Sequence, residues 1–126
     1  KYSCDKNIIF DFSEDYSKSY SNSAFMITDL SSTAFTYSFL TFNPVIFFSP
    51  KEELFKKNYK NLNHFKDRKK IGIVVKNIQS LDKSVKNLLL NSNKFKKPIK
   101  FIRGKIDFIG KSKFKTLEEI KKIIDL

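Results

Sequence analysis

Short apolar runs alternate with amphipathic segments along this chain. Four runs rich in Val, Ile and Phe predict strands, and polar residues flank each of them: Asn7–Phe12, Ala24–Asp29, Pro44–Phe48 and Ile71–Val75. Nearly continuous apolar runs are typical of strands that are covered on both faces, as in a parallel sheet. The pattern therefore indicates a sheet whose strands are separated by helical connections.

Apolar residues at helical spacing fill the intervals between these runs and continue after the last one. We expect a weak helix over Asp15–Ser23 and a stronger one over Ser32–Phe42. Ser49, Pro50 and Glu52 predict a third helix that begins with a capping box. Three later helices are predicted: around Leu81–Leu89 with Ser80 as the cap, over Phe95–Ile109, and from Thr116 at a second capping box.

This order of elements predicts an α/β fold: a small, mainly parallel sheet flanked by helices, followed by a helical C-terminal tail. At 126 residues, with no Pro-, Gly- or Ser-rich linker, residues 1–126 are expected to form a single domain. Four strands are few for a free-standing doubly wound domain, and the first residue is not Met. We therefore expect an upstream N-terminal domain in the same polypeptide.

The positive charge is concentrated in the second part of the chain. Residues 1–50 carry a net charge of −2, whereas residues 51–126 carry +14. Such a field attracts phosphates in nucleic acids, anionic lipids or nucleotides. The basic run Lys94–Lys115 interleaves lysines with Phe and Ile. A helix packed on the core with snorkelling lysines is favoured over a helix lying on an anionic membrane, and both stay open.

Few residues in this sequence suit metal or nucleophile chemistry. Cys4 is the only cysteine, so an internal disulfide is excluded and a reducing compartment is favoured. His64 is the only histidine and lies in a polar context, which predicts an exposed or loop residue. We expect no metal and no cofactor. No apolar run approaches the roughly 20 residues of a membrane span, so a cytoplasmic location, at most peripheral on the inner membrane face, is expected.

The segment from Thr28 to Thr33 carries the most chemistry. It lies between a predicted strand and a predicted helix, where parallel α/β sheets bind ligands. The hydroxyls of Ser31, Ser32 and Thr33 and the free amides of a helix N-terminus predict a cradle for a phosphate or pyrophosphate group.

One segment resembles a known protein family. It is Asn22–Pro50, with the sequence NSAFMITDLSSTAFTYSFLTFNPVIFFSP. It resembles the C-terminal donor-binding domain of CDP-glycerol glycerophosphotransferase-like enzymes and of related capsule or teichoic-acid glycosyltransferases. A strand ending in Thr-Asp, a Ser-Ser pair and a Pro-Val-Ile-Phe-Phe strand carry the resemblance. Ile71–Val75 and Gly110-Lys111-Ser112 extend it more weakly.

The resemblance implies a Rossmann-like half-domain of a GT-B fold that binds a nucleotide-activated glycerol or sugar, CDP-linked first and UDP-linked second. It implies that Ser31, Ser32 and Thr33 hold the donor phosphates and that Thr28 and Asp29 shape the turn or touch the donor. Thr36 stands near the position where many relatives have an acid facing the ribose. The family's catalytic residues lie largely outside the matched stretch, so no catalytic residue is assigned, and this chain is expected to bind without turnover. The acceptor would be a glycan or a lipid-linked polymer.

A second function remains open from the charge alone. A small basic nucleic-acid-binding module would use the lysines of Lys94–Lys115, with steep salt dependence. The sequence contains no RRM, KH, zinc-finger or helix-turn-helix signature that supports it. In that case Ser32 would be irrelevant to binding.

Overall fold

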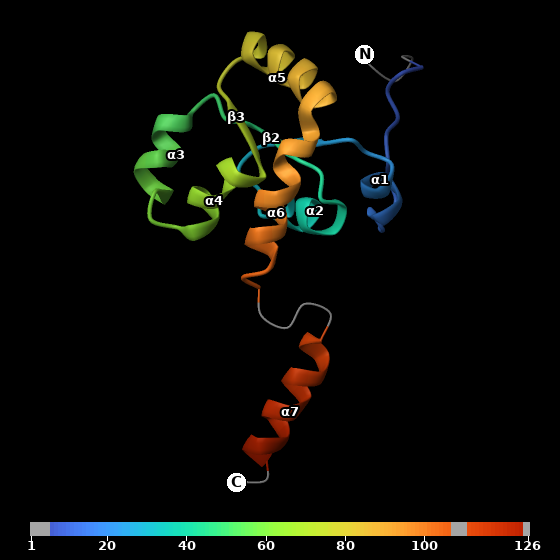
Figure 1. Ribbon diagram of the computed structural model, residues 1–126, viewed down its shortest axis with the longest axis vertical. Helices are drawn as coiled ribbons and strands as arrows, with labels where there is room; N and C mark the ends of the chain where they lie inside the picture. The colour runs from blue at the N-terminus through green and yellow to red at the C-terminus, as the bar shows by residue number, and fades with distance from the viewer. Residues whose placement is uncertain (1–5, 107–110, 125–126) are drawn as a thin grey trace.

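The structure, a computed structural model, describes residues 6–106 and 111–124 (Figure 1). Its centre is a sheet of three parallel strands in the order β1 (Met26–Thr28), β2 (Val45–Phe48) and β3 (Gly72–Val75). The chain is thus an α/β protein with a small parallel sheet flanked by helices, as predicted.

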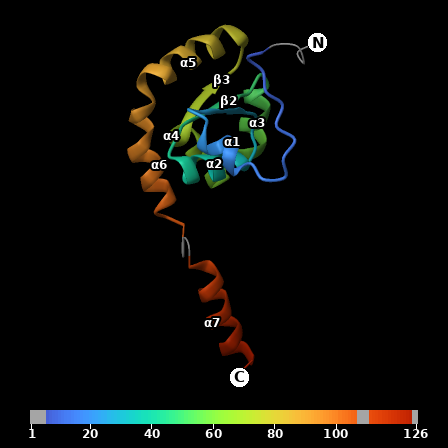
Figure 2. The same cartoon turned by 90° about the vertical axis from the view of Figure 1, so that its right-hand side faces the viewer.

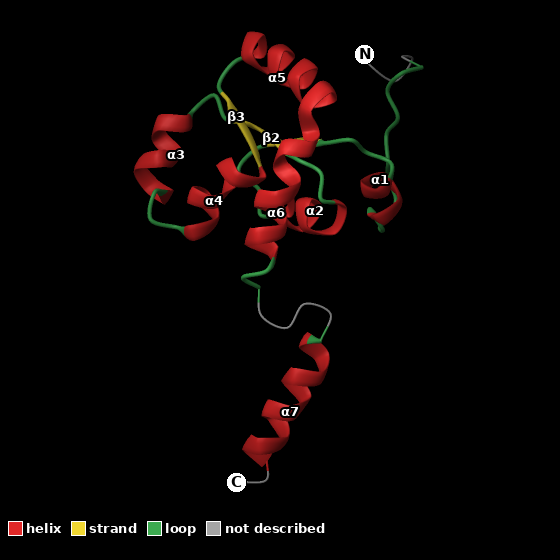
Figure 3. Cartoon of the chain, in the orientation of Figure 1, coloured by secondary structure: helices red, strands yellow, loops and turns green. Residues whose placement is uncertain are grey.

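Helices make all the connections and the C-terminal part of the described chain. They are α1 (Ser17–Ser21), α2 (Thr33–Thr41), α3 (Glu52–Tyr59), α4 (Asn63–Ile71), α5 (Ile78–Asn91), α6 (Lys96–Arg103) and α7 (Ser112–Ile124), with a 3₁₀ turn over Ser92–Phe95. Both views place α3 and α5 on opposite sides of the sheet (Figures 1 and 2). Figure 3 shows how little of the chain is strand compared with helix.

The core lies between the central strand and the helices around it. Val45, Ile46 and Phe47 of β2 are fully buried, as expected for a strand with neighbours on both sides. The buried side chains that surround them come from α2, α4, β3, α5 and α6: Ala34, Tyr37, Ile71, Val75, Leu88, Ile99 and Ile102. Burying each large aliphatic side chain contributes roughly 1.5–3 kcal/mol.

The start of β3 comes unusually close to β2. Gly72 pairs with Val45, and a Cβ built on Gly72 would lie 1.9 Å from the Val45 carbonyl oxygen. Only a residue without a side chain leaves room for this approach. Gly72 therefore fixes how β3 enters the sheet.

The first predicted strand was wrong. Asn7–Phe12 forms no strand, and the side chains of Ile9 and Phe12 are 89% and 90% exposed. In this structure the segment buries too little apolar surface to offset the entropy of ordering a strand. The described sheet consequently has three strands rather than four.

The predicted helix starts also need correction. α3 begins at Glu52 after Lys51, because Ser49 is buried and its amide donates to the Val75 carbonyl oxygen at 2.7 Å. Asn77, not Ser80, caps α5: its side chain accepts from the Ser80 amide at 2.8 Å.

The two predicted C-terminal helices have different bounds from those expected. Thr116 lies inside α7, which begins four residues earlier, so its capping box is absent. The helix predicted over Phe95–Ile109 ends at Arg103, and Ile109 lies outside the described residues.

The basic run divides into two parts with different surroundings. In α6 and the turn before it, Phe95, Ile99 and Ile102 are buried while Lys96 and Lys100 are exposed, so the core-packed interpretation is confirmed there. α6 packs against α2 and α4. By contrast, α7 stands away from the α/β body in both views (Figures 1 and 2), and its apolar side chains are exposed.

Candidate functional site at the strand ends

The loop after β1 reaches α2 through a tight turn built by serines. Ser31 Oγ accepts from the Thr33 amide at 3.2 Å, and the Ser31 and Ser32 carbonyl oxygens accept from the amides of Ala34 and Phe35 at 3.3 and 3.0 Å. These bonds use the first amides of α2 within the turn itself. The amides of Thr33, Ala34 and Phe35 are thus used, whereas those of Ser31 and Ser32 donate no hydrogen bond to another residue in the described ranges.

A hollow of about 590 Å³ opens beside this loop, at the carboxyl end of β1. We call it the strand-end hollow. Its wall combines the β1–α2 loop with side chains of α3, the α3–α4 turn and α4: Asp29, Leu30, Ser31, Phe55, Tyr59, Leu62 and His64. Ligands of parallel α/β sheets bind at this edge, outside the carboxyl ends of the strands.

His64 links the two halves of the wall. It lies in the first turn of α4, and its ring meets the Phe35 ring of α2 edge to face, with 6.5 Å between ring centroids. Its side chain is exposed, as predicted, but it is helical rather than in a loop. The sequence interpretation set His64 aside because it is the only histidine and lies in a polar context, and its contact with Phe35 becomes visible only in the folded chain.

α4 begins beside the strand-end hollow, with His64 in the lining. The amides of Asn63, His64 and Phe65 donate no hydrogen bond to another residue in the described ranges. Such amides and the helix dipole attract negative charge. The N-terminus of α4 therefore lies beside the same hollow as the predicted N-terminus of α2.

The predicted site residues divide between the hollow and its surroundings. Asp29 and Ser31 line it, and the Asp29 carboxylate forms no hydrogen bond or ion pair within the described part of the chain. Ser32 and Thr33 are exposed at the start of α2, just outside the lining. Thr28 is half-buried at the end of β1, and Thr36 is exposed one turn into α2.

The lining offers several kinds of contact. The Ser31 hydroxyl still has its proton to donate, because the bond to Thr33 uses only its oxygen as acceptor. The imidazole of His64 can donate to an anion. Tyr59 and Phe55 of α3, whose rings stack at 6.3 Å, supply an aromatic wall. Asp29 is an acceptor suited to hydroxyl groups.

Comparison with family models, with curated proteins and with solved structures found no match for this chain. Each described helix is too short or too polar to span a bilayer. Within residues 6–106 and 111–124, no three His, Cys, Asp or Glu side chains are grouped to hold a metal ion. The geometry of the chain itself is therefore what bears on function.

Proposed function

We propose that this chain is the donor-binding domain of a GT-B-type transferase that moves a nucleotide-activated glycerol phosphate or sugar onto a surface polymer, such as a capsule or teichoic-acid-like glycan. The observation that carries the proposal is the strand-end hollow, which joins the β1–α2 serine loop to His64 and an aromatic wall. The resemblance of Asn22–Pro50 to donor-binding domains supports the same loop.

The chemistry of the lining fits a nucleoside diphosphate better than a neutral ligand. Ser31 and His64 supply donors for phosphate oxygens, and the N-terminus of α4 at His64 favours negative charge. Tyr59 offers a ring face for a base, a contact worth about 1–3 kcal/mol. Asp29 suits a ribose or glycerol hydroxyl, because a carboxylate beside a phosphate would repel it.

Group transfer needs more than donor binding. An acceptor hydroxyl must be positioned and deprotonated, and the departing nucleotide must be stabilised as negative charge builds on it. The strand-end hollow supplies donors for the departing nucleotide. We assign no general base in this chain, and the acceptor would be brought by a partner domain. We also propose a cytoplasmic location, where nucleotide-activated donors are made.

Calorimetric titration with CDP, CDP-glycerol and UDP tests the proposal. We expect saturable binding that weakens about tenfold when His64 is replaced by Gln, the equivalent of about 1.4 kcal/mol. Ser31→Ala should weaken binding by about threefold, since one neutral hydrogen bond is worth about 1 kcal/mol or less. Ser84→Ala on α5, which removes a hydroxyl far from the hollow, is the matched control and should bind normally.

Two results would contradict the donor-binding proposal. One is the absence of any nucleotide binding by a chain that melts cooperatively. The other is tight binding of single-stranded oligonucleotide that is unaffected by His64→Gln and is lost in moderate salt, which would favour the nucleic-acid module instead.

A further inference from the structure

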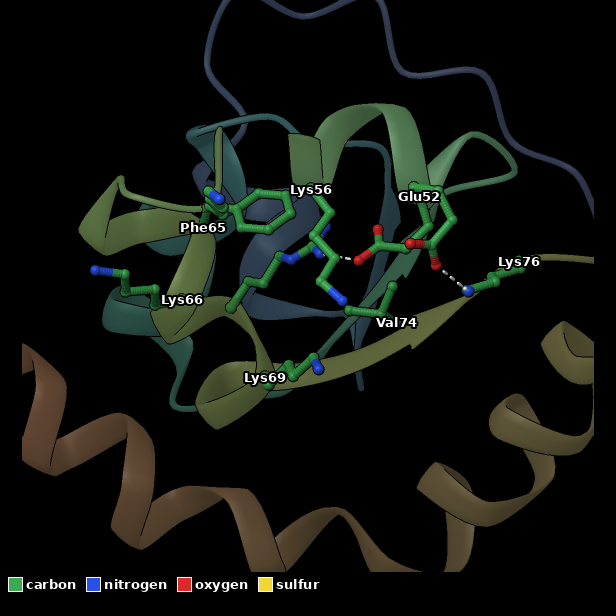
Figure 4. Close-up of a pocket in the computed structure, with 10 residues that line it drawn as sticks. Glu52, Lys56, Phe65, Lys66, Lys69, Val74 and Lys76 are labelled. Carbon is green, nitrogen blue, oxygen red and sulfur yellow. Dashed lines mark hydrogen bonds and ion pairs between the residues drawn. The ribbon is translucent and has the colours of Figure 1, made fainter. Parts of the chain in front are cut away.

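A second cavity, distinct from the strand-end hollow, lies over the outer edge of β3. It has a volume of about 580 Å³ and is bounded by α3, α4 and β3 (Figure 4). We call it the basic pocket. Six of its ten lining residues are cationic and two are carboxylates: Lys56, Lys60, Lys66, Arg68, Lys69 and Lys76 against Glu52 and Glu53.

Arg68 is the unusual member of this set. Its side chain is only 1% exposed, and its Nη2 atom forms an ion pair with Glu52 Oε1. The guanidinium group also lies over the Phe65 ring, 3.8 Å from the centroid. The pair therefore sits at the base of the pocket rather than on its rim.

Most of the Arg68 donors have no partner. Within the described residues, its Nε and Nη1 atoms donate to nothing, and Glu52 Oε2 accepts nothing. An unsatisfied buried donor costs about 1–3 kcal/mol, and more when the group is charged. The Nε–H points to the Nη2 side, so Nε and Nη1 do not act together as a fork. The unused Nη1 group can still donate a charge-assisted hydrogen bond to an oxyanion.

The surrounding lysines are not neutralised. Lys56, Lys60, Lys66 and Lys69 form no ion pair with another residue in the described ranges. In Figure 4 the Lys56 ammonium group lies between Glu52 and Val74, while the Lys66 side chain points away from them. Lys76 differs, because it donates to Glu53 at 2.8 Å, which raises the pKa of Lys76 and lowers that of Glu53.

We infer that the basic pocket binds the terminal phosphate group of a phosphomonoester. A phosphate oxygen accepts from the unused Nη1 group of Arg68, and the ammonium groups of Lys56 and Lys69 close over the remaining charge. The inference does not rest on the proposed donor site, since the two cavities share no lining residue.

Charge and shape favour a monoester over a diester. A monoester is close to dianionic above pH 7, because its second pKa is about 6. It also has three oxygens outside the ester bond, whereas a diester has two. Arg68 is only 1% exposed at the base of the pocket, so a terminal phosphate group reaches it more readily than a phosphate inside a continuous backbone. A nucleic-acid strand therefore fits the pocket less well than a small phosphate ester.

The test is calorimetric titration at pH 7.5 and fixed ionic strength, with methyl phosphate, dimethyl phosphate, inorganic phosphate and a short oligothymidylate as separate ligands. We expect methyl phosphate to bind at least about tenfold more tightly than dimethyl phosphate. Binding of inorganic phosphate as tightly as methyl phosphate would assign the pocket to free phosphate, whereas weaker binding would assign it to an esterified group. Both support a phosphate site.

Paired variants test the residues. The double variant Lys56→Gln with Lys69→Gln should bind methyl phosphate at least about tenfold more weakly, because two charge-assisted contacts are lost. Lys57→Gln with Lys83→Gln removes the same charge outside the pocket and should leave affinity within about twofold. Arg68→Lys keeps the charge but removes the Nη1 donors, and a variant that still melts cooperatively should bind methyl phosphate at least about tenfold more weakly.

Three results would overturn the inference. The first is methyl phosphate binding no tighter than dimethyl phosphate, including no binding of either. The second is an equal loss in the two double variants, which would indicate only a diffuse surface charge. The third is oligothymidylate binding that displaces methyl phosphate and exceeds it in affinity, which would indicate a nucleic-acid groove.

Discussion

The strand-end hollow and the basic pocket are almost equal in volume, at about 590 and 580 Å³, and both are bounded by α3 and α4. Their chemistry differs sharply. The strand-end hollow has aromatic and neutral polar walls with one carboxylate, Asp29, whereas the basic pocket has six cationic side chains. Two different faces of the same helices thus produce two environments.

The difference arises from helical spacing on α3. Phe55 and Tyr59, four residues apart, face the strand-end hollow. Glu52, Lys56 and Lys60, also four residues apart, face the basic pocket. Residues at this spacing share a helix face, so the eight-residue helix separates an aromatic stripe from a charged one. The helix face on which a charged residue lies therefore determines which of the two cavities becomes basic.

The largest expected effect is a loss of stability when the ion pair at the base of the basic pocket is broken. Glu52→Gln leaves the buried Arg68 charge uncompensated and should lower the free energy of unfolding by about 3 kcal/mol. His64→Gln at the strand-end hollow should change it by less than about 0.5 kcal/mol, since that side chain is exposed. Urea unfolding followed by circular dichroism measures both. Equal stability of the two variants would contradict a structural role for the ion pair.

A second prediction separates the cavities by ligand. Tyr59→Ala should weaken CDP binding by about tenfold through loss of base stacking. It should leave methyl phosphate affinity unchanged, because Tyr59 does not line the basic pocket. Tyr16→Ala, an exposed tyrosine before α1, is the control. Loss of both ligands together would show that the two cavities act as one.

A third prediction uses salt. Raising the NaCl concentration from about 50 to about 300 mM should weaken the binding of methyl phosphate by about fivefold, because the electrostatic screening length around the lysines becomes shorter. CDP binding should change by less than about twofold, since no Lys or Arg lines the strand-end hollow. Identical salt slopes for the two ligands would contradict the contrast drawn between the cavities.

The smallest effect sharpens the picture of the basic pocket. Glu53→Gln removes the exposed partner of Lys76 and frees its ammonium group. We expect methyl phosphate to bind about two- to threefold more tightly, in keeping with the modest energy of exposed ion pairs. The affinity for CDP should not change. Weaker methyl phosphate binding in this variant would mean that the Glu53–Lys76 pair orders the pocket.

The α/β class and the parallel sheet follow from local pattern. β2 is a near-continuous apolar run because it is buried on both faces, and that signal is visible without a structure. Asn7–Phe12 has a similar pattern but remains exposed here, since a strand also needs a neighbour that composition does not reveal. Pattern alone thus identified the central strand and misjudged the outer segment.

The candidate sites were less accessible to prediction. The serine loop was foreseen because its residues are contiguous, whereas His64 and Arg68 matter only through partners from other elements. Glu52 illustrates the limit most clearly. Its spacing from Ser49 predicted a cap, but burial directs its carboxylate to Arg68, sixteen residues further along the chain.

Gly72 has a consequence for how this chain tolerates variation. Any side chain there would collide with the Val45 carbonyl oxygen, so β2 and β3 would have to separate at their first paired residues. Val74 and Lys76, which close one side of the basic pocket, follow directly from that point. In a library randomised at this position, selection for folded protein should return glycine alone, while neighbouring Ile73, only half-buried, should accept several β-branched replacements.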